Sequence, residues 1–276
     1  MIQLVEKDEN TTRTYVQQLK QRCDEKDRKV DAIVADILEN VRNNGDKAVA
    51  EYTLKFDGSI PEQVEITKEQ MKELTKQCDA YFLEALERAA KNIHEFHSRQ
   101  KQQSWLDTKD NGVILGQRVR GLAKVGIYVP GGTAAYPSSV LMNAIPAKIA
   151  GVQEIVMVTP PGKDGKPNPD IMAAALVAGV DRVFLVGGAQ AVAALAYGTE
   201  TMPKVDKIVG PGNIFVATAK KHLYGTVDID MIAGPSEILI VADETANPKY
   251  LAADLMSQAE HDVLASAILL TTSSKI

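Results

Sequence analysis

From residue 111 onward, short apolar runs alternate with alanine-rich stretches of helical composition. Continuous apolar runs are typical of strands buried on both faces, and strand–helix–strand alternation is typical of parallel sheets. The expected strands are 124–129, 154–159, 182–186, 207–209, 238–241 and 266–270, and the expected helices are 138–150, 169–179, 189–198, 213–222 and 247–261. The sequence therefore predicts an α/β fold with parallel sheets that helices cover on both faces.

The first 110 residues have a different character, with 40 of the 67 charged residues but only two of the 19 glycines. Apolar side chains recur at helical spacing from Val30 to Val41, and Gly45 is placed to end that helix. Thr67 and Gln70 fit a capping box that opens another helix. That helix is expected to continue to about residue 79, and further helices are expected over 46–56 and over 81–102. Residues 1–20 carry little periodicity and are expected to form a separate arm.

Composition narrows the class of protein. With 45% hydrophobic and 24% charged residues, the chain is too apolar to be disordered. Its net charge of −5 and its lack of a basic stripe exclude a general nucleic-acid binder. Every apolar run is interrupted well before the roughly 20 residues that a bilayer span needs, and the charged start lacks the apolar segment of a secretory signal. We therefore expect a cytoplasmic protein that binds neither nucleic acid nor membrane.

Three glycine-rich turns each follow an expected strand and precede an expected helix. They are the segment 126–133 (GIYVPGGT), the segment 186–190 (VGGAQ) and the segment 210–213 (GPGN). Glycines there let the backbone approach a phosphate or a flat cofactor, and the free N–H groups of a helix N-terminus favour an anion. Gln190 can hydrogen-bond a nicotinamide carboxamide or a ribose without adding charge. The usual G-x-G-x-x-G fingerprint is absent.

Each of these turns also has a purely structural interpretation. The first two can be tight strand–helix connections or helix caps, and Asn213 is a good N-cap residue in its own right. What favours a ligand site is recurrence, because the carboxyl ends of neighbouring strands form the ligand crevice of an open α/β sheet.

A candidate half of a zinc site lies in the segment 257–262 (SQAEHD). Gln258 and His261 are three residues apart on an expected helix, so they share a face, and zinc accepts nitrogen and oxygen ligands. The chain has only three other histidines. His94 and His97 are placed on the solvated face of a charged helix, and His222 ends a Lys-Lys-His run at a helix C-terminus, where the helix dipole favours a cation.

Two other catalytic classes are excluded. Cys23 and Cys78 lie in charged helical stretches with no basic group placed to stabilise a thiolate, and neither belongs to a CxxC pair. No G-x-S-x-G elbow is present, which excludes a serine hydrolase of that type.

Five segments, taken in order, resemble the histidinol dehydrogenase family, whose members catalyse the last step of histidine biosynthesis. They are 126–151, 186–199, 207–221, 230–243 and 251–262, and their spacing is collinear with the family along nearly the whole chain. The resemblance implies two incomplete Rossmann-like units with parallel sheets, preceded by charged N-terminal helices. The implied division is an arm at 1–20, a discontinuous first unit at 21–125 plus 237–276, truncated in its second half, and a second unit at 126–236.

The resemblance also implies an activity. The family oxidises L-histidinol to L-histidine through the bound aldehyde, with NAD and a zinc ion, and it works as a homodimer. Carried over position by position, the NAD contacts fall on Tyr128, Gln190 and Asn213, a substrate contact falls on Ser236, and two of the four zinc ligands, which also lie against the substrate, fall on Gln258 and His261.

The chain departs from the family in length. The Glu-His acid–base pair, an Asp and a His that complete the zinc site, and the tail that reaches the partner subunit all match positions after Ile276. We therefore expect no catalytic residue in these 276 residues and interpret them as an inactive fragment. The strand at 266–270 lacks a returning helix, so exposed apolar surface and an unpaired sheet edge are expected there. The alternative is a naturally shortened paralogue.

Two further functions stay open. One is a related zinc-dependent alcohol dehydrogenase that acts on another substrate, because the residues that would read the distinctive end of the substrate fall largely outside this chain. The other is a non-catalytic module that binds NAD through residues 122–236. A panel of substrates would test the first, and titration with NAD+ in the presence and absence of zinc would test the second.

Overall fold

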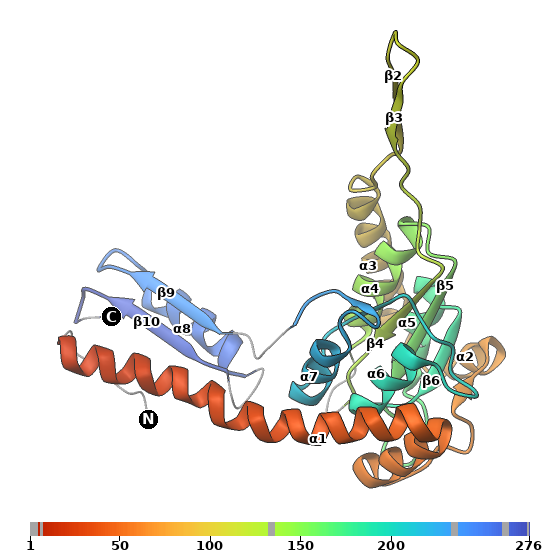
Figure 1. The fold of residues 1–276 in the computed structure, drawn as a ribbon. Helices are drawn as coiled ribbons and strands as arrows, with labels where there is room; N and C mark the ends of the chain where they lie inside the picture. The colour runs from red at the N-terminus through yellow and green to blue at the C-terminus, as the bar shows by residue number, and fades with distance from the viewer. Residues whose placement is uncertain (1–4, 6–7, 132–135, 233–236, 261–264, 275) are drawn as a thin grey trace. The chain divides into compact units, whose positions relative to one another are not determined.

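The computed structural model describes all residues except 1–4, 6–7, 132–135, 233–236, 261–264 and 275, and describes only the backbone of residues 9–10 and 18–28. The chain forms two compact units, residues 1–232 and residues 233–276 (Figure 1). None of the helices in its described part combines the length and the apolar composition that crossing a bilayer requires.

The larger unit is built on a six-stranded sheet with the order β1-β6-β5-β4-β7-β8. All neighbouring strands are parallel except the edge pair of β1 and β6. From β4 the chain adds β5 and β6 on one side and then β7 and β8 on the other, so the strand order reverses at β4. The strands are β1 (Glu65–Ile66), β4 (Lys124–Tyr128), β5 (Glu154–Thr159), β6 (Arg182–Leu185), β7 (Lys207–Val209) and β8 (Asp228–Ile229).

Helices cover both faces of this sheet, which confirms the prediction from its apolar strands. Because successive strand residues point to opposite faces, Ile127 enters one core and Tyr128 the other. The Tyr128 face is covered by α1, α6 and α7, and the Ile127 face by α2 to α5. The helices are α1 (Glu9–Asp57), α2 (Lys68–Thr75), α3 (Ala80–Ser98), α4 (Pro137–Ile149), α5 (Pro169–Ala178), α6 (Gly188–Tyr197) and α7 (Ile214–Leu223).

Individual residues that begin or end a helix lie where the sequence predicted them. Gly45 has φ +50 and interrupts α1, so the expected stop between two helices is confirmed. Thr67 and Gln70 form the expected capping box at the start of α2. Asn213 accepts the backbone N–H groups of Phe215 and Val216 and caps α7. The helical backbone reaches back to Glu9, well before the apolar stripe that begins at Val30.

Four strands were not predicted. The edge strands β1 and β8 have only two residues each. The strands β2 (Trp105–Thr108) and β3 (Ile114–Gln117) form an antiparallel hairpin whose side chains are exposed at every position. Without a buried face, a hairpin of this kind leaves no alternation of apolar and polar residues in the sequence.

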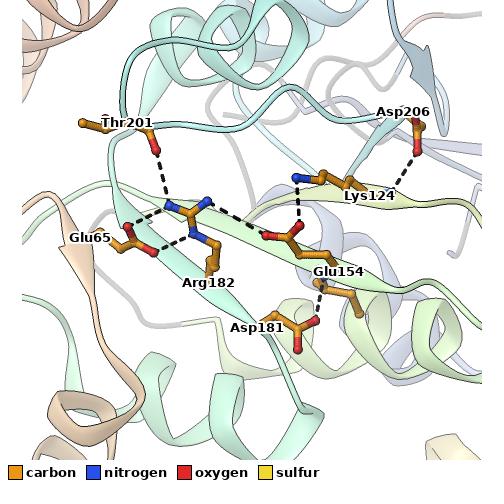
Figure 2. Close-up of polar contacts among 8 residues, drawn as sticks. Glu65, Lys124, Glu154, Asp181, Arg182, Thr201 and Asp206 are labelled. Atoms are coloured by element: carbon orange, nitrogen blue, oxygen red, sulfur yellow. Dashed lines mark hydrogen bonds and ion pairs between the residues drawn. The ribbon is translucent and has the colours of Figure 1, made fainter.

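A network of charged side chains closes the amino ends of β4, β5 and β6 (Figure 2). Arg182 donates hydrogen bonds of 2.6 and 2.8 Å to Glu65, and its guanidinium lies 3.9 Å from Glu154. Lys124 pairs with the same Glu154 at 2.9 Å, and its backbone N–H donates to Asp206. The hydrogen bonds from Arg182 hold the pKa of Glu65 below its ordinary value. Because parallel α/β sheets bind ligands at the carboxyl ends of their strands, this network has a structural role.

The smaller unit contains two parallel strands and one helix: β9 (Ile238–Ala242), α8 (Pro248–Ala259) and β10 (Ala267–Thr271). Its elements match the expected strand–helix–strand pattern. Several apolar strand side chains are exposed, among them Leu239, Val241 and Leu270. The expectation of exposed apolar surface in this part of the chain is therefore confirmed.

Candidate functional site

Three turns meet at the carboxyl edge of the larger sheet, after β4, β5 and β6. Pro160, which follows β5, lies against Gly131 after β4 and against Gly187 after β6. A Cβ atom added to Gly187 would come within 2.7 Å of the Pro160 side chain, and one added to Gly131 would overlap it. These two glycines therefore have a packing role, which allows the three turns to lie close together.

Tyr128 connects the turns after β4 and β6. Its side chain is 3% exposed, and its hydroxyl oxygen accepts the backbone N–H of Gly188 at 3.0 Å. Burial raises the pKa of Tyr128 to about 12, so the group is a neutral phenol at physiological pH. The phenol O–H is left to donate in another direction.

Gln190 lies in the first turn of α6, beside the same contact. Its side chain is 1% exposed, and neither its oxygen nor its nitrogen has a hydrogen-bond partner. Its amide lies close to Gly188, whose φ of +65 strains residues other than glycine. The N-cap residue of α6, Gly187, makes no side-chain cap, and the Tyr128 hydroxyl accepts the N–H of the first helical residue, Gly188. A buried amide with neither group satisfied is costly to a folded protein, so it calls for a ligand or a water as its partner.

Asn213 reaches the same edge from the turn after β7. A Cβ atom added to Gly210 would overlap the carbonyl oxygen of Tyr128, so the turn that starts at Gly210 lies directly against the end of β4. The Asn213 side chain is exposed, and its oxygen serves as the α7 cap. The structural interpretation of Asn213 is thus confirmed, while its amide NH2 group takes no part in the cap.

An ion pair between a buried lysine and a partly exposed aspartate holds the turn after β7. Lys220, with a side chain 3% exposed, donates to the Gly210 carbonyl at 3.0 Å and pairs with Asp230. Asp230 also accepts the Gly210 N–H at 2.8 Å. The pair therefore holds both backbone polar groups of Gly210. This role was not predicted from the sequence, although Lys220 lies at helical spacing from the apolar residues Val216 and Leu223.

Asp57 and Ser59, at the C-terminal end of α1 and just after it, were also missed. The Asp57 Oδ2 atom and the Ser59 Oγ atom are buried and have no hydrogen-bond partner. Burial raises the pKa of Asp57 above its ordinary value, and the carboxylate in turn contributes to the raised pKa of Tyr128. The only sequence signal at this point is an Asp-Gly turn after a helix, which does not reveal proximity to a distant strand.

Only one of the two expected zinc ligands lies among the described residues. Gln258 lies on α8 with its Nε2 atom buried and unpaired. His261 and Ser236 lie outside the described residues. Within the described ranges, no group of three or more His, Cys, Asp and Glu side chains could hold a metal ion. The residues that the structure describes therefore do not by themselves fit a zinc ion.

The remaining histidines and Cys78 behave as expected from the sequence. His94 and His97 lie on α3, where His97 contacts Gln100 at 2.7 Å. His222 ends α7 and contacts Asp31 at 2.9 Å. Burial and the nearby Asp170 raise the pKa of the Cys78 thiol to about 11, so it is not an activated nucleophile. The side chain of Cys23 lies outside the described residues.

The larger unit also has a cavity of about 690 Å³. Its lining comes mainly from α4 and the residues after it and from the segments 100–102 and 119–122, and Asp230 borders it as well. It does not include Tyr128, Gln190 or Asn213. The cavity and the unpaired polar groups of Gln190 therefore indicate different places. The buried amide of Gln190 is the stronger indication of a ligand site.

Comparison with known proteins agrees with this geometry. A sequence profile described as histidinol dehydrogenase matches residues 20–276. The histidinol dehydrogenase of Clostridium acetobutylicum is 61% identical over 262 residues, which are 95% of this chain and 61% of the relative. That of Listeria innocua is 61% identical over 240 residues, which are 87% of this chain and 56% of the relative.

A solved structure gives the same result. The crystal structure of histidinol dehydrogenase from Elizabethkingia anophelis matches with a TM-score of 0.81 and 41% identity, over 88% of this chain and 57% of that chain. The chain spans 56% to 61% of the length of these three relatives. With a matching profile over most of its residues and a fold shared with a solved relative, the chain belongs to the histidinol dehydrogenase family.

Proposed function

We propose that this chain forms the NAD-binding part of an enzyme that oxidises L-histidinol to L-histidine. The observation that carries the proposal is the buried, unpaired amide of Gln190 at the carboxyl edge of the sheet, beside Gly188 and the Tyr128 hydroxyl. An amide that can donate and accept fits an uncharged polar part of a dinucleotide. Gly187 gives α6 no side-chain cap, so the N–H groups of its first turn other than that of Gly188, which binds Tyr128, add donors near the same point.

NAD, when bound, supplies the acceptor for the hydride that leaves the alcohol carbon. The residues of this chain bind and orient. Gln190 hydrogen-bonds a carboxamide or ribose through both of its polar atoms, and Asn213 donates from its NH2 group while its oxygen caps α7. Tyr128 stays protonated because its pKa is about 12, so it acts as a hydrogen-bond donor and adds no charge.

For the substrate side, we propose that Ser236 and Gln258 contact L-histidinol, and that Gln258 and His261 contribute two of the zinc ligands of the complete enzyme. The support is family membership together with the unpaired Nε2 atom of Gln258; α8 ends at Ala259, two residues before His261, so the helix face expected from the sequence is not part of it. No chemical step is assigned to zinc here, because the described residues do not assemble its site.

The wider organisation is part of the same proposal. We propose Rossmann-like units at 126–236 and at 21–125 plus 237–276, with residues 1–20 as an arm, and a homodimer for the complete enzyme. The reversal of strand order at β4 supports the unit at 126–236, since Rossmann-like sheets share it. A cytoplasmic location stays a prediction from the sequence.

A polypeptide of these 276 residues is expected to show no histidinol-dependent NADH formation. The family resemblance assigns the acid–base pair and half of the zinc ligands to positions outside it, so hydride transfer lacks its proton acceptor. Absorbance at the NADH maximum, with L-histidinol, NAD+ and zinc present, measures this directly. Steady NADH production that depends on L-histidinol would contradict the expected loss of activity, and production with a different alcohol would favour the related dehydrogenase.

Replacing Gln190 by leucine is expected to weaken NAD+ binding about tenfold, because two hydrogen bonds to the dinucleotide are lost. The same replacement is expected to leave the melting temperature unchanged or higher, since it removes two buried groups that have no partner in the free protein. Isothermal titration calorimetry with NAD+ measures the affinity, and circular dichroism measures the melting temperature.

The matched control for this experiment is Gln103→Leu, at an exposed position after α3. It should change neither NAD+ affinity nor the melting temperature by a measurable amount. Equal affinities for the unchanged chain and Gln190→Leu would remove the main support for the proposed site. Tight NAD+ binding without zinc, combined with no activity in any longer form of the protein, would instead favour a non-catalytic module.

A further inference from the structure

Three side chains in the described part of residues 1–232 carry buried polar atoms without a hydrogen-bond partner: Asp57, Ser59 and Gln190. Unpaired buried groups are uncommon in folded proteins and require an explanation. All three belong to segments that lie near the carboxyl ends of β5 and β6. Gln190 is already part of the proposed cofactor site, so the other two raise the question of what they bind.

Three observations place Asp57 and Ser59 near this edge of the sheet. The carbonyl of Val64 accepts the N–H of Leu185 at 2.7 Å, which ties the segment after α1 to the last residue of β6. A Cβ atom on Gly165, in the loop after β5, would lie 3.7 Å from the Ser59 Oγ atom. The Asp57 carboxylate is close enough to the Tyr128 hydroxyl to raise its pKa. The two residues thus border the same edge as Tyr128 and Gln190.

We propose that Asp57, assisted by Ser59, binds the vicinal diol of the adenosine ribose of NAD and thereby selects NAD over NADP. This inference rests on the proposed function of the site. An ionised carboxylate can only accept hydrogen bonds, so its partner must donate and must carry no negative charge. Two neighbouring ribose hydroxyls meet both conditions, because each donates to one carboxylate oxygen, whereas a phosphate is repelled.

The topology indicates which ribose is bound. The parallel strands of the sheet begin at β4, and β5 and β6 are added outward from it, which corresponds to the first three strands of a Rossmann-like unit. In such units an acidic residue in the first half of the sheet hydrogen-bonds the ribose 2′-hydroxyl of NAD, while NADP carries a 2′-phosphate at that position. Here the acid comes from the end of α1 instead of from the second strand, which explains why no acidic residue stands at the end of β5.

In the free protein this arrangement costs stability. The pKa of Asp57 is raised by burial, so the stabilising contribution of the protonated form is present below the ordinary value of 3.8 and is lost as pH rises through the raised pKa. At neutral pH an ionised Asp57 is therefore less favourable than an isosteric amide. A carboxylate kept in this position fits a binding role better than a structural one.

The test uses the 276-residue chain, the variant Asp57→Asn and the control Asp36→Asn, which lies on the same helix with an exposed side chain. Calorimetry with NAD+ is expected to show a loss of affinity of about 10- to 100-fold for Asp57→Asn, the range for a lost hydrogen bond to a charged group. NADP+ should lose less or gain, so that the preference for NAD+ falls at least about tenfold. Ser59→Ala should weaken NAD+ binding in the same direction by a smaller factor.

The melting temperature separates binding from structure. Asp57→Asn is expected to melt at the same temperature as the unchanged chain or higher, and Asp36→Asn should match the unchanged chain in every measurement. A lower melting temperature with equal losses for both dinucleotides would show a structural carboxylate and overturn the inference. If Asp57→Asn keeps the affinity and selectivity of the unchanged chain, the proposed role of Asp57 is overturned, but the proposed NAD site is not. If the unchanged chain binds no NAD+, both proposals are overturned.

Discussion

Replacing Gly210 by alanine is expected to lower the free energy of unfolding of the larger unit by about 4 kcal/mol, which few single replacements reach. Gly210 has φ +114, where residues other than glycine are strained. Its missing side chain also leaves room for the Tyr128 carbonyl, which a Cβ atom would overlap. Because the obstacle is backbone at the end of a central strand, the clash cannot be relieved by a change of rotamer.

The control for this replacement separates the backbone strain of a positive φ from the steric overlap of the added Cβ atom. Gly225 also has a positive φ, +99, but no atom lies within 4 Å of the position of an added Cβ. Gly225→Ala should therefore cost only about 1 to 2 kcal/mol. Urea unfolding followed by circular dichroism measures both variants. Similar losses in the two would mean that the turn after β7 can move away from β4, and the proposed shape of the cofactor site would have to be revised.

The sheet of the larger unit could be predicted because its strands are continuous apolar runs with sharp ends. The predicted bounds of β5 and β7 agree with the structure at both ends. Helix ends were predictable where one residue dominates the local energy. The helix expected over 169–179 agrees with α5 to within one residue, and the structure shows Asn168 as its N-cap and Gly179, with φ +74, just after its end. At such positions the chemistry is local, so three or four neighbouring residues contain the information.

The β2–β3 hairpin and the two-residue edge strands were not predictable for the same physical reason. Their side chains are exposed or their pairing is too short to leave a period in the sequence. Edge strand β1 exists because the segment after α1 pairs with β6, which lies far along the chain. Pairing of this kind is set by the tertiary fold, and single-sequence patterns do not contain it.

In the candidate site, some of the predicted residues have a structural role and one does not. The structural interpretation holds for Gly131 and Gly187, which make room for Pro160, and for Asn213, which caps α7. It does not account for Gln190, whose buried amide has no partner. The sequence located the turns correctly, but only the three-dimensional contacts separate residues that serve packing from those left to bind a ligand.

The second large effect is expected at the ion pair beneath the turn after β7. Asp230→Ala should lower the free energy of unfolding by about 3 kcal/mol, because it leaves the buried ammonium of Lys220 without its counter-charge. Lys220 is 3% exposed at its side chain and would keep only the Gly210 carbonyl as an acceptor among the contacts described. The Gly210 N–H would lose its acceptor as well.

A neighbouring pair provides the matched control. Asp228 pairs with Lys207 at 2.7 Å, but this lysine side chain is 30% exposed, against 3% for Lys220, and Asp228 is 52% exposed, against 30% for Asp230. Asp228→Ala should therefore cost within about 1 kcal/mol, as for other surface pairs. Denaturant unfolding compares the two variants.

A double replacement tests the cause. If an unpaired buried charge is responsible, adding Lys220→Met to Asp230→Ala should recover part of the lost stability, because the ammonium no longer has to be desolvated. The recovery should be incomplete, since both backbone groups of Gly210 stay without their side-chain partners. Equal losses for Asp230→Ala and Asp228→Ala would instead mean that water reaches Lys220, and the turn that carries Asn213 would then depend on Gly210 alone for its position against β4.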